Sequence, residues 1–146
     1  MTKSIAAFVI ALLTTLNIAA QDLPVKWTFQ VEPSADGTHT VVATATLDDG
    51  WSVYSQHTES GGPIATSFSY VNADPLTDTA EESPAPTKEF SELFELEVQK
   101  FKGKATFTQK VQTHPEAKML KVSVRYMCCD DTKCLPPTVQ EFAFQL

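Results

Sequence analysis

The chain has 146 residues with 42% hydrophobic side chains, and its 11 basic and 18 acidic side chains give a formal net charge of −7. An acidic surface argues against binding to nucleic acid or to anionic lipid, because both would be repelled. The length suits one domain with a single core and leaves little room for a second.

The first twenty residues, MTKSIAAFVIALLTTLNIAA, have the pattern of a secretory signal peptide. Lys3 precedes an apolar run over residues 5–13, which is shorter than the roughly 20 apolar residues that a bilayer span requires. We therefore expect a signal peptide at residues 1–20, cleaved after Ala20, rather than an N-terminal core helix. Cleavage leaves residues 21–146 as a periplasmic or secreted domain without a direct membrane anchor. Its ten basic and 18 acidic side chains give a formal charge of −8.

Short segments of alternating apolar and polar residues follow one another along the rest of the chain. This period of two is typical of half-buried β-strands. The segments are KWTFQV, HTVVATATL, WSVY, TSFSY, KATFTQKV, MLKVSVRYM and EFAFQL. A turn signal, Asp48-Asp49-Gly50, precedes the third of them. About seven short strands without a long helical pattern predict an all-β fold, an immunoglobulin-like antiparallel β-sandwich.

Two stretches interrupt this pattern. SQHTESGGPIAT is expected to be a loop, because it contains a Gly-Gly-Pro run. Residues 72–98 are acidic and contain prolines, and they end in an apolar cluster of Phe90, Leu93, Phe94 and Leu96. A loop of this length in a small domain is usually functional or disordered, and the apolar cluster favours a functional cap loop. The alternative is a short amphipathic helix that packs on the edge of the sandwich.

All three cysteines lie in one stretch, YMCCDDTKCLPP, at residues 126–137. In a secreted protein a cysteine pair is often a structural disulfide. A ring of about six residues, however, contributes only about 2.2 kcal/mol in the loop-entropy model, against about 4.7 for a hundred residues. Three thiols and His114 can also supply four metal ligands. Adjacent cysteines on a strand point to opposite faces, which argues against a shared metal ion.

The strand alternation separates the two adjacent cysteines. Even-numbered positions from Leu120 to Tyr126 are apolar, whereas the odd positions between them are polar. If the strand continues, Cys128 points into the core and Cys129 points outwards, where it can reach Cys134 across a four-residue loop. A bulge at the strand end would reverse this arrangement, so Cys128 remains the alternative redox cysteine.

The charges around the pair distinguish its two sulfurs. Thiol-disulfide exchange requires an accessible sulfur, an available thiolate and a nearby partner sulfur. Lys133 precedes Cys134 and favours its thiolate, whereas Asp130 and Asp131 follow Cys129 and disfavour the thiolate there. This reasoning selects Cys134 as the sulfur that exchanges with partners, unless solvent screens these charges.

These residues resemble a known family, the N-terminal periplasmic domain of the transmembrane thiol-disulfide interchange protein DsbD and its stand-alone relatives. The resemblance covers nearly the whole chain after the signal peptide. It includes KWTFQV, DDGWSVYSQ, GGPIATSF, the stretch from ELFELEV to FKGKATFTQKV, and YMCCDDTKCLPP, which is the most specific of these motifs.

The resemblance implies an immunoglobulin-like fold with one redox pair, which falls on Cys129 and Cys134. It implies that Cys134 forms the mixed disulfides, and that a cap phenylalanine, Phe94 or Phe90, shields the pair. Tyr54 matches a family aromatic residue near the site, although a plain core role is an equal alternative. The best-known family member has one more residue between its cysteines, a spacing that Cys128 would restore.

The resemblance also implies a redox carrier that works as a thiol-disulfide oxidoreductase without a metal or other cofactor. Its donor would be a separate transmembrane protein of the DsbD/CcdA type, and its acceptors would be oxidised periplasmic or secreted proteins. The alternative is a non-redox immunoglobulin-like interaction module in which a short disulfide stiffens a binding loop.

Overall fold

The computed structural model describes residues 22–146, so the predicted signal peptide and its cleavage after Ala20 lie outside the described residues. The described residues form twelve β-strands and no helix, which confirms the predicted all-β class. All strand pairs are antiparallel. Within residues 22–146, no helix is long and apolar enough to cross a membrane.

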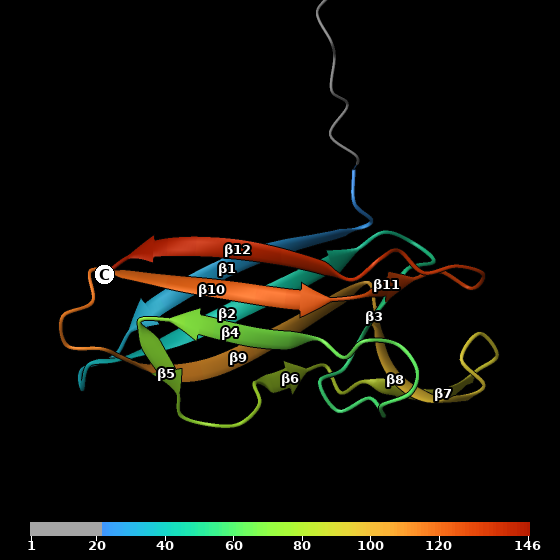
Figure 1. The fold of residues 1–146 in the computed structure, drawn as a ribbon, viewed down its shortest axis with the longest axis horizontal. Coiled ribbons are helices and arrows are strands. Elements are labelled where there is room, and N and C mark those ends of the chain that lie inside the picture. Colours follow the sequence, from blue (N-terminus) through green and yellow to red (C-terminus); the bar gives the residue numbers. More distant parts are fainter. Residues whose placement is uncertain (1–21) are drawn as a thin grey trace, which may run out of the picture.

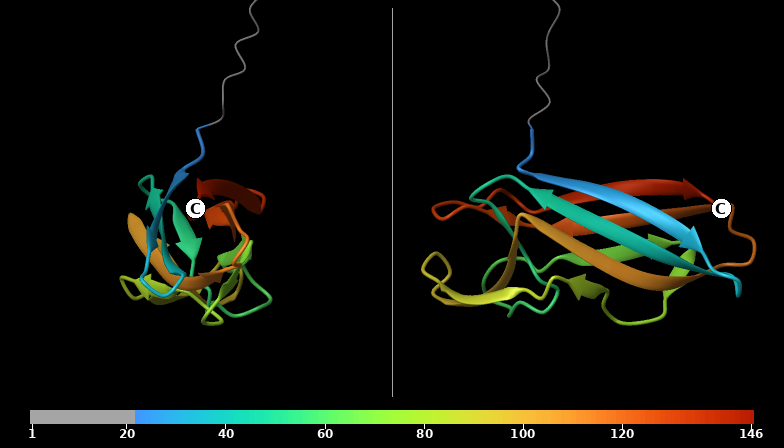
Figure 2. Two further views of the ribbon diagram at one scale, coloured as in Figure 1. Left: turned by 90° about the vertical axis from the view of Figure 1, so that its left-hand side faces the viewer. Right: turned by 180° about the vertical axis from the view of Figure 1, so that it is seen from behind.

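The sandwich consists of two antiparallel sheets (Figures 1 and 2). One sheet contains β1 (Val25–Pro33), β2 (Thr38–Leu47), β9 (Lys104–Thr113) and, side by side on the far edge of β9, β5 (Ala73–Pro75) and β6 (Glu81–Ser83). The other contains β12 (Thr138–Gln145), β10 (Met119–Tyr126) and β4 (Ser67–Val71). Apolar side chains from both sheets meet in shared clusters, so the two sheets enclose one core.

A third, smaller sheet extends from the end of the sandwich that lies opposite the C-terminus (Figure 1). Its order is β11 (Cys128–Cys129), β3 (Ser52–Tyr54), β8 (Leu96–Lys102) and β7 (Thr87–Ser91). Strands β7 and β8 form a hairpin whose turn is residues 92–95, and we call residues 87–102 the cap hairpin. All three cysteines lie in this sheet or in the loop that follows it.

The core follows the alternation that the sequence shows. On β10 the even-numbered residues from Leu120 to Tyr126 are buried, as predicted. Trp27 of β1 lies between the sheets, with ring centroids 5.4 Å from Tyr126 and 5.7 Å from Phe107. The long strands therefore adopt the predicted faces, and aromatic rings fill the space between them.

Residues 72–98 differ from the sequence-based expectation, which was a long loop or a short helix. The segment contains β5, β6 and β7 and enters β8, so only the turn at residues 92–95 corresponds to the expected apolar loop. In that turn the Glu95 amide donates to the Ser91 carbonyl oxygen at 2.7 Å, and Glu95 has a positive φ of 57°. Pairing of β5 and β6 with β9 and of β7 with β8 supplies hydrogen-bond partners for the backbone of these three strands.

We expect Phe107→Ala to lower the free energy of unfolding by about 3–5 kcal/mol, because it opens a cavity between the two sheets. Phe107 is fully buried and its ring contacts Trp27, Phe68 and Phe101. Phe90→Ala is the matched control, because Phe90 is 65% exposed, and its effect should stay within about 0.5 kcal/mol. Denaturant unfolding of the signal-free domain measures both, and equal losses would contradict this description of the core.

Candidate functional site

The chain passes directly from the sandwich into the third sheet between Tyr126 and Cys128. Tyr126 ends β10, and after Met127 the two cysteines form β11, which pairs with β3. Cys128 lies opposite Val53, and both side chains belong to the main core with Tyr126. Cys128 is 3% exposed, and burial raises the pKa of its thiol above the ordinary value. A buried protonated thiol of this kind behaves as a small apolar side chain.

Cys129 lies on the opposite face of β11, as the alternation predicts, but it does not reach solvent. It is 2% exposed and packs in a separate cluster with Tyr54 and Val98. The expectation of an outward, solvent-facing Cys129 was wrong in this respect, because the cap hairpin covers that face. The two adjacent cysteines therefore occupy two different apolar environments.

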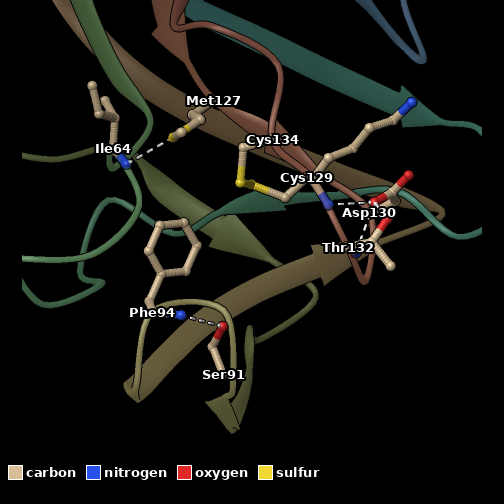
Figure 3. The surroundings of a disulfide bond; sticks show 9 residues. Ile64, Ser91, Phe94, Met127, Cys129, Asp130, Thr132 and Cys134 are labelled. Carbon is tan, nitrogen blue, oxygen red and sulfur yellow. Dashed lines mark hydrogen bonds between the residues drawn. A yellow bond between two sulfur atoms is a disulfide. The ribbon is translucent and has the colours of Figure 1, made fainter.

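Cys129 and Cys134 form a disulfide with an S–S distance of 2.00 Å, and Cys134 is half-buried (Figure 3). The intervening loop has its own hydrogen bonds. The Asp130 amide donates to the Lys133 carbonyl oxygen at 2.9 Å, and Asp130 Oδ1 accepts from the amides of Thr132 and Lys133 at 2.8 Å each. These bonds hold the pKa of the Asp130 carboxyl below its ordinary value. The ring is thus a tight, hydrogen-bonded turn with an ionised carboxylate at its start.

Phe94, in the turn of the cap hairpin, points towards the disulfide (Figure 3). It is half-buried and packs against the cluster that contains Cys129, and its ring centroid lies 6.2 Å from that of Tyr54 at 88°. The Phe94 amide donates to Ser91 Oγ at 3.4 Å. Phe90 instead lies on the other face of β7 from Glu89 and Ser91 and is 65% exposed. The structure thus places Phe94, and not Phe90, beside the disulfide.

A second loop closes the other side of the disulfide, a feature that the sequence analysis missed. The Ile64 amide, in the GGPI segment, donates to Met127 Sδ at 3.4 Å (Figure 3). Gly62 of the same segment lies against the cap hairpin, because an added Cβ there would lie 3.2 Å from the Leu96 methyl groups. Met127 lies two residues before Cys129, so the two side chains point to the same side of the chain. This alternation in the sequence could have predicted that Met127 lies near the disulfide.

Tyr54 and Lys133, the two other predicted site residues, occupy different surroundings. Tyr54 belongs to the cluster of Cys129 and is 4% exposed. Burial raises the pKa of its hydroxyl to about 12, so the group is neutral at physiological pH. Lys133 is exposed and borders a hollow with Trp51 and Leu135, which pack on the main core. The structure thus adds burial as a difference between the two sulfurs, and the effect of Lys133 on Cys134 stays a prediction.

The metal alternative required His114 to lie near the thiols. The structure places His114 Nε2 3.0 Å from Asp74 Oδ2, on the loop after β9 at the other end of the sandwich (Figure 1). Within residues 22–146, no three His, Cys, Asp or Glu side chains are grouped as metal ligands. Cys128 and Cys129 also belong to separate clusters, so the four donors considered from the sequence do not come together.

Comparison with solved structures shows the same fold in two N-terminal domains. The N-terminal periplasmic domain of ScsB from Proteus mirabilis matches with a TM-score of 0.64 and 14% identity, over 89% of this chain and 49% of that one. The chain thus spans about half of that ScsB chain. The Neisseria meningitidis DsbD N-terminal domain in the reduced form matches with a TM-score of 0.54 and 15% identity. This match covers 82% of this chain and 84% of that one. These matches confirm the predicted immunoglobulin-like β-sandwich.

Comparison with curated protein sequences finds no match. A family model described as "Thiol:disulfide interchange protein DsbD, N-terminal" matches residues 19–146, which include every residue of the site described above. The chain therefore belongs to the family of DsbD N-terminal domains, whose shared chemistry is thiol-disulfide exchange.

Proposed function

We propose that this protein is a carrier of reducing equivalents outside the cytoplasm, with residues 1–20 as a cleaved signal peptide and residues 21–146 as one redox domain. It receives electrons from a transmembrane donor of the DsbD/CcdA type and passes them to oxidised periplasmic or secreted proteins. One observation carries the proposal: a disulfide between Cys129 and Cys134 lies under an aromatic cap, with one sulfur buried and the other half-buried.

The difference in burial between the two sulfurs supports one order of the exchange steps. A partner thiolate attacks Cys134 Sγ, the more accessible sulfur, and the bond to Cys129 breaks so that Cys129 leaves as a thiolate and takes up a proton. A second partner thiolate then attacks the partner's own sulfur in the mixed disulfide and releases Cys134, which is protonated in turn. The domain gains two electrons and two protons, and the partner is left with a disulfide. The reverse sequence reduces an acceptor.

The competing function is a non-redox module with a structural disulfide. The ring between the cysteines spans a sequence separation of five, for which the loop-entropy gain is only about 2 kcal/mol. The turn is also held by the hydrogen bonds of Asp130 and by the Leu135 amide, which donates to the Cys128 carbonyl oxygen at 2.9 Å. A disulfide adds little stiffness to a turn that is already closed in this way, so these observations favour the carrier.

The reduction potential decides between the two functions. We expect the Cys129–Cys134 couple to equilibrate with a glutathione redox buffer and to have a potential above about −300 mV, because a carrier must be reduced and reoxidised in use. Acid quenching, alkylation and mass spectrometry of the purified domain measure the reduced fraction. A potential far below that limit would make the disulfide structural and end the carrier proposal.

The order of attack predicts different results for serine variants. With an oxidised peptide, a disulfide of two cysteine peptides, Cys134→Ser should form no mixed disulfide. In Cys129→Ser, the Cys134 thiolate should attack that disulfide, release one peptide thiol and keep the mixed disulfide, because the resolving sulfur is gone. Cys128→Ser is the control: exchange should continue, although a buried hydroxyl costs about 1–3 kcal/mol of stability. Mass spectrometry of the trapped species, beside thermal unfolding of each variant, measures these outcomes. A folded but inactive Cys128→Ser protein would show that the pair had been misidentified.

Shielding by the cap predicts that Phe94→Ala exposes the reduced pair. The variant loses the edge contact with Tyr54, a type of aromatic contact worth about 0.5–1.5 kcal/mol, so the dithiol should react about two- to tenfold faster with iodoacetamide. Phe90→Ala replaces an exposed ring of the same hairpin and should leave the rate unchanged. Equal rates in wild type and Phe94→Ala would remove Phe94 from the shielding role.

A further inference from the structure

A cavity of about 240 Å³ lies between the cap hairpin and the turn that carries Asp130 and Asp131. Its lining includes Tyr54 and Val98, which also pack directly on Cys129. Asp130 and Asp131 of its lining also belong to the turn that connects Cys129 with Cys134, so the cavity lies near the disulfide. The side chains that line the cavity can therefore affect which partner proteins react with the disulfide. This inference rests on the proposed exchange function.

The cavity carries an excess of negative charge. Four carboxylates, Glu89, Glu92, Asp130 and Asp131, line it with one ammonium group, that of Lys100. Lys100 forms a salt bridge with Glu89, so these two charges offset each other. Glu92 and Asp131 are exposed and have no ion pair within residues 22–146. Three carboxylates therefore remain without a cation in the cavity lining.

Tyr54 offers an unpaired hydroxyl group at the same cavity. Its side chain is almost fully buried and borders the cavity, yet its hydroxyl has no hydrogen bond within the described residues. Tyr70, which is half-buried, donates to Gln109 at 2.8 Å, and the buried Tyr126 accepts from Gln140 at 3.1 Å. The Tyr54 oxygen is not among the fully buried atoms without a partner within residues 22–146, so it is open to the cavity and free to accept a donor that enters there.

Apolar side chains complete the same surface. Phe90 and Leu93 of the cap hairpin also line the cavity, and they are 65% and 45% exposed. Large exposed apolar side chains next to a reactive group are typical of a contact surface. A lysine or arginine side chain matches this combination, because its stem packs on apolar surface while its charged head donates to carboxylates and to a hydroxyl.

We infer that the cavity receives a basic side chain of the partner protein, next to the partner's reactive cysteine, so that exchange favours partners with lysine or arginine at that position. The carboxylates of Glu92, Asp130 and Asp131 attract the basic group, and the Tyr54 hydroxyl accepts from it. Charge complementarity of this kind acts mainly on the rate of productive encounter.

Three reduced peptides of equal length test this inference, each with one cysteine flanked by two arginines, two alanines or two glutamates. Their rates of reducing the oxidised domain are divided by their rates with dithiodipyridine, a neutral disulfide, which corrects for thiol reactivity. At low ionic strength we expect the arginine peptide to react about tenfold faster than the glutamate peptide. The preference should shrink at 0.5 M NaCl, because exposed charges are then screened.

Two variants of cavity residues and one control distinguish the effect of the cavity from the effect of the protein's overall negative charge. The double variant Glu92→Gln, Asp131→Asn should reduce the arginine preference to about threefold or less, and Tyr54→Phe should lower it without changing the charge. Glu116→Gln removes an exposed carboxylate from the loop between β9 and β10 and should leave the preference unchanged. Thermal unfolding confirms that each variant is folded.

The outcomes separate this inference from the proposed function. If the wild-type disulfide reacts with all three peptides at equal corrected rates, exchange stands and the basic-partner inference is overturned. A preference that survives unchanged in the double variant also overturns it, because the charge would then come from elsewhere. If none of the peptides forms a mixed disulfide, the exchange function itself is wrong.

Discussion

The pairing of β3 with β11 is the constraint on which the site depends. Cys128 lies opposite Val53 and Cys129 opposite Ser52, so each face of this short ladder receives one cysteine. Val53 and Cys128 complete the main core, whereas Tyr54 and Cys129 form the floor beneath the cap. A shift of one residue in this register would turn Cys129 towards the core and Cys128 towards the cap. The cysteine that bonds to Cys134 would then lie in the core. The sandwich thus positions the disulfide by anchoring the neighbouring Cys128.

The two sides of this ladder differ in the amount of apolar surface that they bury. The core side continues into the sandwich and its aromatic cluster, whereas the cap side has only three buried residues and a few half-buried ones around them. Local opening requires little free energy where few apolar contacts are lost. The proposed function requires the cap hairpin to move away from Cys134, and the few apolar contacts on this side favour such a movement while the sandwich remains folded.

The sequence predicts the long strands well, because each of them turns one apolar face towards the core. β1, β2, β9, β10 and β12 follow the period of two, and their inward residues are those that the alternation indicates. β5, β6 and β7 were not predicted, since they are short and mostly polar and are held by pairing with β9 and β8. The burial of Cys129 was missed for the same reason: the cap that covers it is formed by strands with no pattern of their own.

The acidic residues of the chain affect the chemistry of the disulfide more directly than they affect the molecule as a whole. Cys129 is buried and is followed by Asp130 and Asp131, and both features disfavour a thiolate there. On the proposed mechanism, Cys129 leaves as a thiolate, so the closed site resists attack even at the half-buried Cys134. Opening of the cap admits water to Cys129, and a basic side chain in the adjacent cavity offsets the carboxylates. A partner that supplies both changes would therefore lower the barrier to its own exchange reaction.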